Sequence, residues 1–139
     1  MPRLRVLAVS NRLPAWAESA CADYARRMPR GYELERIALK PGPREGARLR
    51  AAVPKSSRLV ALDERGRDLT TAQFAPLLAQ ETAFVIGGAD GLDPQLKNEA
   101  ALVVRLSSLT LPHALAQLLL VEQIYRAATL LTGHPYHRA

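Results

Sequence analysis

Short apolar runs alternate with segments of helical character along the chain. Runs typical of strands lie at Leu4–Val9, Tyr32–Leu39, Arg58–Leu62, Phe84–Ile86 and Leu102–Leu106. Helices are predicted between these runs and after the last one: Pro14–Met28, Ala47–Val53, Thr70 or Thr71 to about Gln80, a short helix before Leu102, and His113–Thr132. Because strands alternate with helices, the pattern predicts an α/β fold with a mainly parallel sheet and helices on both faces.

The segments between these elements are polar or rich in proline and glycine. Asp63–Arg67 follows a predicted strand directly and is expected to turn the chain. In the first helix, Cys21 shares a face with Ala17 and Tyr24 at helical spacing. Cys21 is therefore interpreted as a small core residue and not as a nucleophile.

The last predicted helix is apolar around most of its circumference. Its apolar positions include Leu115, Leu118, Leu119, Val121, Ile124, Tyr125, Ala128 and Leu131. A chain with so few elements cannot cover such a helix on all sides, which predicts a twofold homodimer through it. Gln117, Glu122, Gln123 and Arg126 interrupt the apolar stretch, so it is not expected to span a bilayer.

The overall composition is that of a folded protein, and 139 residues fit a single domain, 1–139. Hydrophobic residues make up 48% of the chain, which is too many for a disordered one. One cysteine excludes an internal disulfide and fits a reducing cytoplasm. The first residues, Met1–Arg5, begin no apolar run long enough for a signal peptide, so a cytoplasmic location is expected.

Positive charge is concentrated in the first half of the chain. Residues 1–67 contain 15 Lys/Arg and 7 Asp/Glu, a net +8, whereas residues 68–139 contain 4 and 6, a net −2. This asymmetry favours a polyanionic partner, bound mainly by the first half. The candidates for phosphate contact are Arg3, Arg5, Arg26, Arg27, Arg30, Arg44, Arg48 and Arg50.

Two predicted strands end abruptly in loops of small residues. Phe84–Ile86 runs into Gly87-Gly88, and Leu102–Leu106 runs into Ser107–Pro112. The carboxyl ends of strands in an open α/β sheet are where such folds bind ligands. Taken separately, the glycines also suit a tight turn, and the Ser/Thr residues also suit a helix cap.

Several well-known catalytic motifs are missing from the sequence. It has no Cys/His set with zinc spacing, no phosphate-binding loop ending in Gly-Lys, and no Gly-x-Ser-x-Gly nucleophile elbow. No metal is therefore expected.

Four segments, taken together, resemble the RlmH-type methyltransferases of the SPOUT class. Ile86–Leu92 is similar to the family's Gly-Gly-x-acid-Gly loop, and Leu106–His113 to its cofactor loop. Glu122–Ala127 is similar to its dimer helix, and His134–Arg138 to its C-terminal signature. Weaker similarity extends over nearly the whole chain. The sequence departs from the family pattern at Ala89, where proline is common, and in the stretch 40–58, which is shorter.

The resemblance implies a SPOUT-type fold with a C-terminal trefoil knot. It implies S-adenosyl-L-methionine as methyl donor and N3 of a pseudouridine in large-subunit (23S) ribosomal RNA, naked or in the assembled ribosome, as acceptor. The residues then expected around the donor are Leu62, Gly87, Gly88, Leu106, Ser107, Ser108, Leu109, Thr110 and Leu111.

The C-terminal tail is the candidate catalytic segment. Tyr136, His137 and Arg138 combine a phenol, an imidazole and a guanidinium. His137 is the candidate proton acceptor, and Arg138 the candidate group for binding phosphate or the developing anion. The tail is expected to reach the donor pocket of a partner subunit. A tail that only packs is the alternative, since chain termini are often frayed.

Two other functions fit parts of the same pattern. One is a non-catalytic ribosome-binding or assembly factor, which would bind RNA without the donor. The other is a small-molecule enzyme that uses a different nucleotide, which the α/β pattern alone also allows.

Overall fold

Five strands form one sheet in the computed structural model, which describes residues 2–138 except for the side chains of the last two. All neighbouring strands are parallel, in the spatial order β2-β1-β4-β3-β5. The strands are β1 (Arg3–Val9), β2 (Glu33–Leu39), β3 (Arg58–Asp68), β4 (Thr82–Ile86) and β5 (Leu102–Arg105). The predicted α/β class with a parallel sheet is confirmed.

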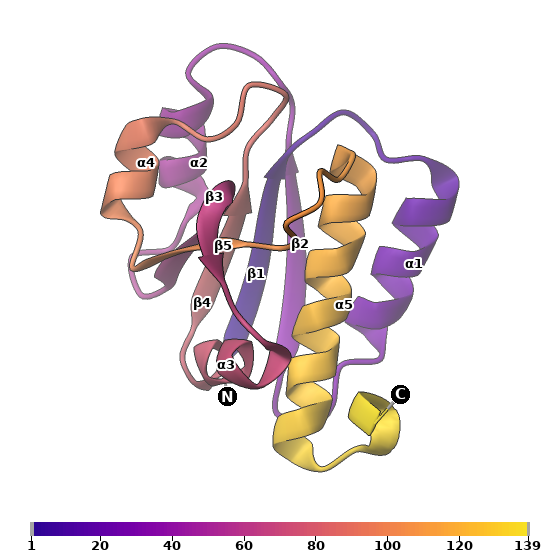
Figure 1. Cartoon of the computed structure of the whole chain (residues 1–139). Coiled ribbons are helices and arrows are strands. Elements are labelled where there is room, and N and C mark those ends of the chain that lie inside the picture. Colours follow the sequence, from indigo (N-terminus) through magenta and orange to yellow (C-terminus); the bar gives the residue numbers. More distant parts are fainter. Residues whose placement is uncertain (1, 139) are drawn as a thin grey trace.

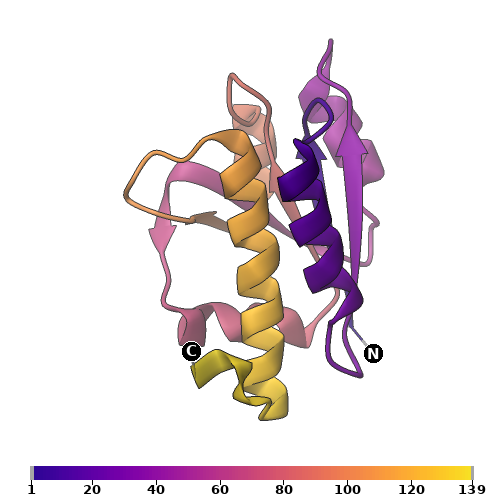
Figure 2. The same ribbon diagram turned by 90° about the vertical axis from the view of Figure 1, so that its right-hand side faces the viewer.

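Helices connect the strands and cover the two faces of the sheet (Figure 1). They are α1 (Ala15–Arg26), α2 (Glu45–Ala52), α3 (Thr71–Phe74), α4 (Pro94–Glu99) and α5 (His113–Thr132), with 3-10 turns η1 (Ala75–Ala79) and η2 (Pro135–Arg138). Helices α1 and α5 lie side by side on one face, and α2 and α4 lie on the other (Figures 1 and 2).

The alternation of side chains along the central strand divides the core in two. On β4, Phe84 and Ile86 belong to the cluster under α1 and α5, whereas Ala83 and Val85 belong to the cluster under α2 and α4. Cys21 is fully buried in the first cluster, as predicted from its helical face. Burying apolar side chains on both faces is what makes every residue of β4 inaccessible to water.

The third strand differs from the prediction. Asp63–Arg67 was expected to turn the chain after Leu62, but β3 continues to Asp68. The pairing with β5 shifts register between Leu62 and Arg67, and the outer half of β3 passes in front of β5 (Figure 1). Gly66 permits this crossing, because a Cβ there would lie 2.6 Å from the backbone carbon of Val104. Beyond the crossing, a bidentate ion pair between Arg105 and Asp68 joins β3 and β5.

The helix predicted from Thr70 or Thr71 to about Gln80 is divided in the structure. Thr70 caps α3 with a reciprocal capping box to Gln73. The chain then tightens into η1, whose second residue is Pro76. Proline has no N–H for the next α-helical hydrogen bond, which accounts for the break.

The last helix spans the predicted residues, His113–Thr132. Gly133 ends it with φ +76°, in the left-handed conformation that glycine adopts without cost. By length and composition α5 could cross a membrane, but core helices of soluble proteins meet the same two criteria. One side of it, including Leu120, Val121 and Ile124, is buried against the sheet.

Candidate active site

A cavity of about 750 Å³ opens where β3, β4 and β5 end. Cavities of roughly 300–1,000 Å³ are typical of small-molecule sites. The structure brings all of the predicted donor-binding residues to its lining: Leu62, Gly87, Gly88, Leu106, Ser107, Ser108, Leu109, Thr110 and Leu111. They come from Leu62 within β3 and from the loops after β4 and β5, which meet because Leu62 pairs with Ile86 at the end of β4 and with Val104 of β5.

The loop after β4 is folded tightly upon itself. The N–H of Gly91 donates to the carbonyl of Gly88 at 3.0 Å, and Gly91 has φ +79°. A Cβ on Gly87 would lie 2.5 Å from the backbone carbon of Gly91, which no side chain allows. Glycine at position 87 is therefore required by the turn itself, and it leaves bare backbone at the cavity wall.

The loop after β5 presents hydroxyl groups and ends at α5. The Ser107 hydroxyl accepts a hydrogen bond from the N–H of Leu109 at 2.9 Å, which shapes the start of the loop. Ser108, Leu109 and Thr110 are exposed at the cavity. Pro112 then occupies the position before the first turn of α5.

Sequence reasoning missed a third segment of the lining, Asp63–Arg65, together with Lys97. Asp63 accepts the N–H of Arg65 at 3.0 Å and pairs with the ammonium of Lys97 at 3.5 Å. Asp63 follows Leu62 of β3 just as Gly87 follows β4, and that equivalence is the signal that could have identified it.

His113 also lines the cavity and was not among the predicted site residues. One of its ring nitrogens, Nε2, lies 3.2 Å from the side-chain amide nitrogen of Gln117, which is buried one turn later in α5. Burial lowers the pKa of His113 from its usual value. The imidazole is therefore expected to be neutral near pH 7, with Nε2 accepting from the amide.

The predicted catalytic tail lies at the other end of α5 (Figure 2). Tyr136 does not line the cavity; its hydroxyl donates to Glu122 at 2.9 Å and lies 2.9 Å from the hydroxyl of Tyr24. The side chains of His137 and Arg138 are outside the described part of the structure. Within one chain, the tail and the donor loops are thus separated.

The structure sorts the arginines that were candidates for phosphate contact. Five of them pair with carboxylates: Arg3, Arg5, Arg26, Arg27 and Arg50. Arg48 donates to the backbone carbonyls of Lys40 and Pro43. Arg30 and Arg44 are exposed, and no ion pair to either is seen among the described residues. Arg44 is also the described non-glycine residue with positive φ, at +56°.

The described residues contain no group of three or more His, Cys, Asp or Glu side chains arranged to hold a metal ion. The cavity offers glycine backbone, hydroxyls, a neutral imidazole and five charged side chains, Asp63, Glu64, Arg65, Asp90 and Lys97. Three carboxylates against two cations suit an organic ligand that carries positive charge.

The sequence is similar to known proteins along nearly the whole chain. Residues 2–137 match the family model described as "Predicted SPOUT methyltransferase". The protein named ribosomal RNA large subunit methyltransferase H from Polynucleobacter asymbioticus is 50% identical, over 98% of this chain and 99% of its own length. The protein of the same name from Burkholderia thailandensis is 47% identical, over 99% of both chains.

A solved structure shows the same fold at low sequence similarity. It is the SpoU methyltransferase AviRb from Streptomyces viridochromogenes, in complex with the cofactor AdoMet. The TM-score is 0.54 at 19% identity, over 92% of this chain and 57% of that one. Because the family model matches nearly the whole chain and a full-length relative is 50% identical, the chain belongs to the SPOUT methyltransferase family.

Proposed function

We propose that the protein transfers a methyl group from S-adenosyl-L-methionine to N3 of a pseudouridine in large-subunit (23S) ribosomal RNA. The observation that carries the proposal is the cavity at the ends of β3, β4 and β5, in a chain half identical to a protein named for methylating large-subunit ribosomal RNA. A cytoplasmic location follows from that substrate.

The cavity residues fit the methyl donor. The bare backbone at Gly87 and Gly88 lets a flat nucleoside approach the wall of the cavity closely. The hydroxyls of Ser108 and Thr110, exposed at the rim, suit the donor's ribose and amino-acid groups. The apolar side chains of Leu62, Leu106 and Leu111 complete the lining on the other sides.

S-adenosylmethionine supplies the methyl group from a sulfonium, in an in-line displacement by the acceptor nitrogen. The chain must position that nitrogen and remove its proton, and positioning alone can contribute roughly 7–11 kcal/mol in favourable systems. We assign to His137 the role of accepting the proton of the acceptor nitrogen. Arg138 would stabilise the developing negative charge of the base or bind a flanking phosphate. Measuring turnover of His137→Ala and Arg138→Ala tests the roles; wild-type rates in both would remove the tail from the reaction.

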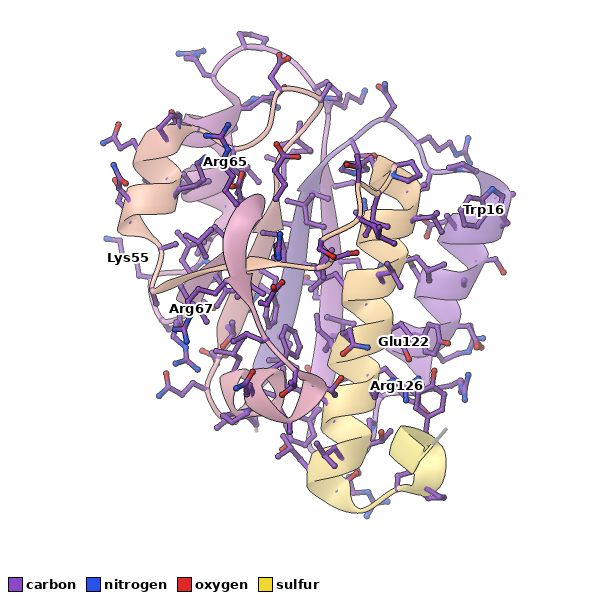
Figure 3. All side chains as sticks on the ribbon, in the orientation of Figure 1. Trp16, Lys55, Arg65, Arg67, Glu122 and Arg126 are labelled. Carbon is purple, nitrogen blue, oxygen red and sulfur yellow. The ribbon has the colours of Figure 1, made fainter. Side chains whose placement is uncertain are left out.

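A homodimer would bring the tail and the pocket together. Tyr136 is bonded to Glu122, nine residues along α5 from His113 at the cavity, so roughly 14 Å of helix separate them. A second chain can supply the tail that the first cannot. Leu115 and Leu119 of α5 are exposed at 39% and 36%, and Trp16 of α1 is exposed at 55% (Figure 3 labels Trp16). These side chains offer the apolar surface for that contact.

A trefoil knot in the C-terminal part is the further expectation of this family. Its support is the crossing at Gly66, where residues 63–68 of β3 pass over β5 before the chain continues to β4. The cofactor loops after β4 and β5 would then be held by the chain's own threading. A tight turn such as Gly87–Gly91 needs such a rigid frame to stay open to a ligand.

Calorimetric titration with S-adenosylmethionine, followed by methyl transfer to ribosomes and to naked 23S RNA, tests the whole proposal. We expect binding of the donor and transfer to at least one of the two substrates. RNA or ribosome binding without donor binding would instead indicate a non-catalytic assembly factor. Neither donor nor RNA binding would indicate a small-molecule enzyme.

A further inference from the structure

The hydroxyl of Tyr136 has its hydrogen-bonding capacity filled within its own chain. It donates to Oε2 of Glu122 at 2.9 Å, so at the same distance Tyr24 must be the donor to it. Glu122 is equally engaged: Arg126 donates to Oε2 at 2.9 and 3.0 Å, and Gln123 donates to Oε1 at 2.8 Å. A hydroxyl in such a network is not available to a substrate.

The ring of Tyr136 is held as firmly as its hydroxyl. Tyr125 packs edge-on against it with 4.6 Å between ring centroids, and Tyr24 does so at 6.2 Å. The guanidinium of Arg126 lies 5.0 Å from the ring centroid. Glu122 and Arg126 both project from α5 above the C-terminal turn (Figure 3). Two aromatic rings and one cation therefore fix the side chain in place.

Proton chemistry by Tyr136 is also disfavoured. Burial, the hydrogen bond with Tyr24 and the hydrogen bond to Glu122 all raise the pKa of Tyr136 well above its usual value. The phenol stays protonated across the neutral range, so it cannot take the proton of an acceptor nitrogen. The chemistry of Tyr136 is thus already used inside its own chain.

We propose that Tyr136 is a positioning residue: locked between Glu122 and Tyr24, it pins the tail to its own α5 and α1, so that His137 and Arg138 leave the protomer from a fixed point toward the partner's pocket. The part of the inference that concerns the partner's pocket rests on the proposed function. The anchor itself rests only on the contacts within one chain.

The anchor explains why a short tail can serve a site in another subunit. Without an anchor, the seven residues beyond α5 would sample many positions, and ordering them costs roughly 1–2 kcal/mol per residue. When Tyr136 is fixed, most of this loss of conformational entropy has already occurred on folding. The glutamate, the arginine and the three tyrosines then act on turnover without touching the reacting atoms.

Two substitutions test the anchor. Tyr136→Phe removes the phenol hydroxyl, and Glu122→Gln replaces the carboxylate by a neutral amide. Hydrogen exchange of the amides of residues 136–139 reads the anchor directly, and we expect it to accelerate about tenfold in both variants. The donor's Kd should stay unchanged, because the network is remote from the cavity. For methyl transfer, kcat should fall by similar factors in both, and the double variant should lose no more than either single one.

Tyr32→Phe is the matched control, since it removes a phenol hydroxyl outside this network, and its tail exchange should equal that of wild type. Unchanged tail exchange in both test variants would overturn the anchor. A Tyr136→Phe loss that multiplies with that of Glu122→Gln would instead place the hydroxyl on the substrate and also overturn it. If wild-type protein transfers no methyl group, the proposed function fails, whereas the exchange result still decides the anchor.

Discussion

The backbone around Gly87 leaves no room for a methyl group. An added Cβ would meet the backbone of Gly91 at 2.5 Å, and backbone cannot give way as a flexible side chain can. We predict that Gly87→Ala opens the loop, destabilises the fold by about 1–3 kcal/mol and weakens donor binding at least tenfold. Calorimetric titration and thermal unfolding measure the two effects.

Gly88→Ala is the control for this prediction. Its Cβ would meet a carboxylate oxygen of Glu45 at 3.1 Å and a methyl group of Val9 at 3.3 Å, both of which have some freedom to move. The loss of donor affinity should be clearly smaller than in Gly87→Ala. Equal affinities in wild type and Gly87→Ala would show that the donor does not bind against this turn.

His113 should make stability depend on pH. Burial lowers its pKa in the folded state. Below about pH 6.5 the unfolded chain therefore binds a proton that the folded chain refuses, so the neutral His113 contributes stability above that pH and loses it as the pH falls. We predict that wild type loses more stability than His113→Gln between about pH 7.5 and 5.5. Urea unfolding at both values checks this, and equal losses would contradict it.

At the scale of elements, the sequence predicted the buried strands and the long helix well. Thr82–Ile86 is buried on both faces and four of its five residues are apolar, so the run is visible in the sequence. The continuation of β3 was hidden, because Asp63–Asp68 is polar and looks like a turn. What makes it a strand is pairing with β5, about 40 residues later, and the space left by Gly66. The same nonlocality concealed Asp63 and His113 as cavity residues.

We propose that the β2–α2 connection contacts RNA near the cavity. Arg48 ties it together through the carbonyls of Lys40 and Pro43, and Glu45 accepts the N–H of Gly42 at 3.2 Å. Glu45 also lies beside Gly88 of the cavity. Arg44, exposed and in the left-handed conformation, is the residue next to it. Backbone strain of this kind is often retained where a side chain serves a function.

We predict that Arg44→Asn raises the KM for the ribosomal substrate several-fold and lowers the salt dependence of binding by about one charge. Asparagine tolerates the left-handed conformation, so the change removes charge with little effect on the backbone. Arg50→Asn in α2 is the matched control, because that guanidinium is paired with the carboxylate of Glu99 at 2.8 Å. Donor affinity should be the same in both. Equal KM values in the two variants would move the RNA surface elsewhere.

At the scale of the whole molecule, the sequence singled out both proposed parts of the site, the pocket loops and the tail, but not the contacts that hold the tail. The tail sits on Glu122 and Tyr24, which are 14 and 112 residues away in sequence, through contacts that no local pattern announces. The helix that carries Glu122 begins at the cavity, so its length keeps the two halves apart. With the proposed roles of His137 and Arg138, a complete site would require two chains, and dimerisation would then be a condition for catalysis.

Mixing two inactive variants tests this arrangement. Gly87→Ala lacks a donor pocket but keeps its tail, whereas a His137→Ala, Arg138→Ala double variant lacks the tail but keeps its pocket. After exchange of subunits, half of the dimers are mixed and each contains one intact pocket with one intact tail, so the mixture should recover about a quarter of wild-type activity. Adding Leu119→Glu to both chains should abolish the recovery, because it buries a charge at the proposed contact. A mixture as inactive as its components, although sedimentation shows mixed dimers, would mean that each chain completes its own site.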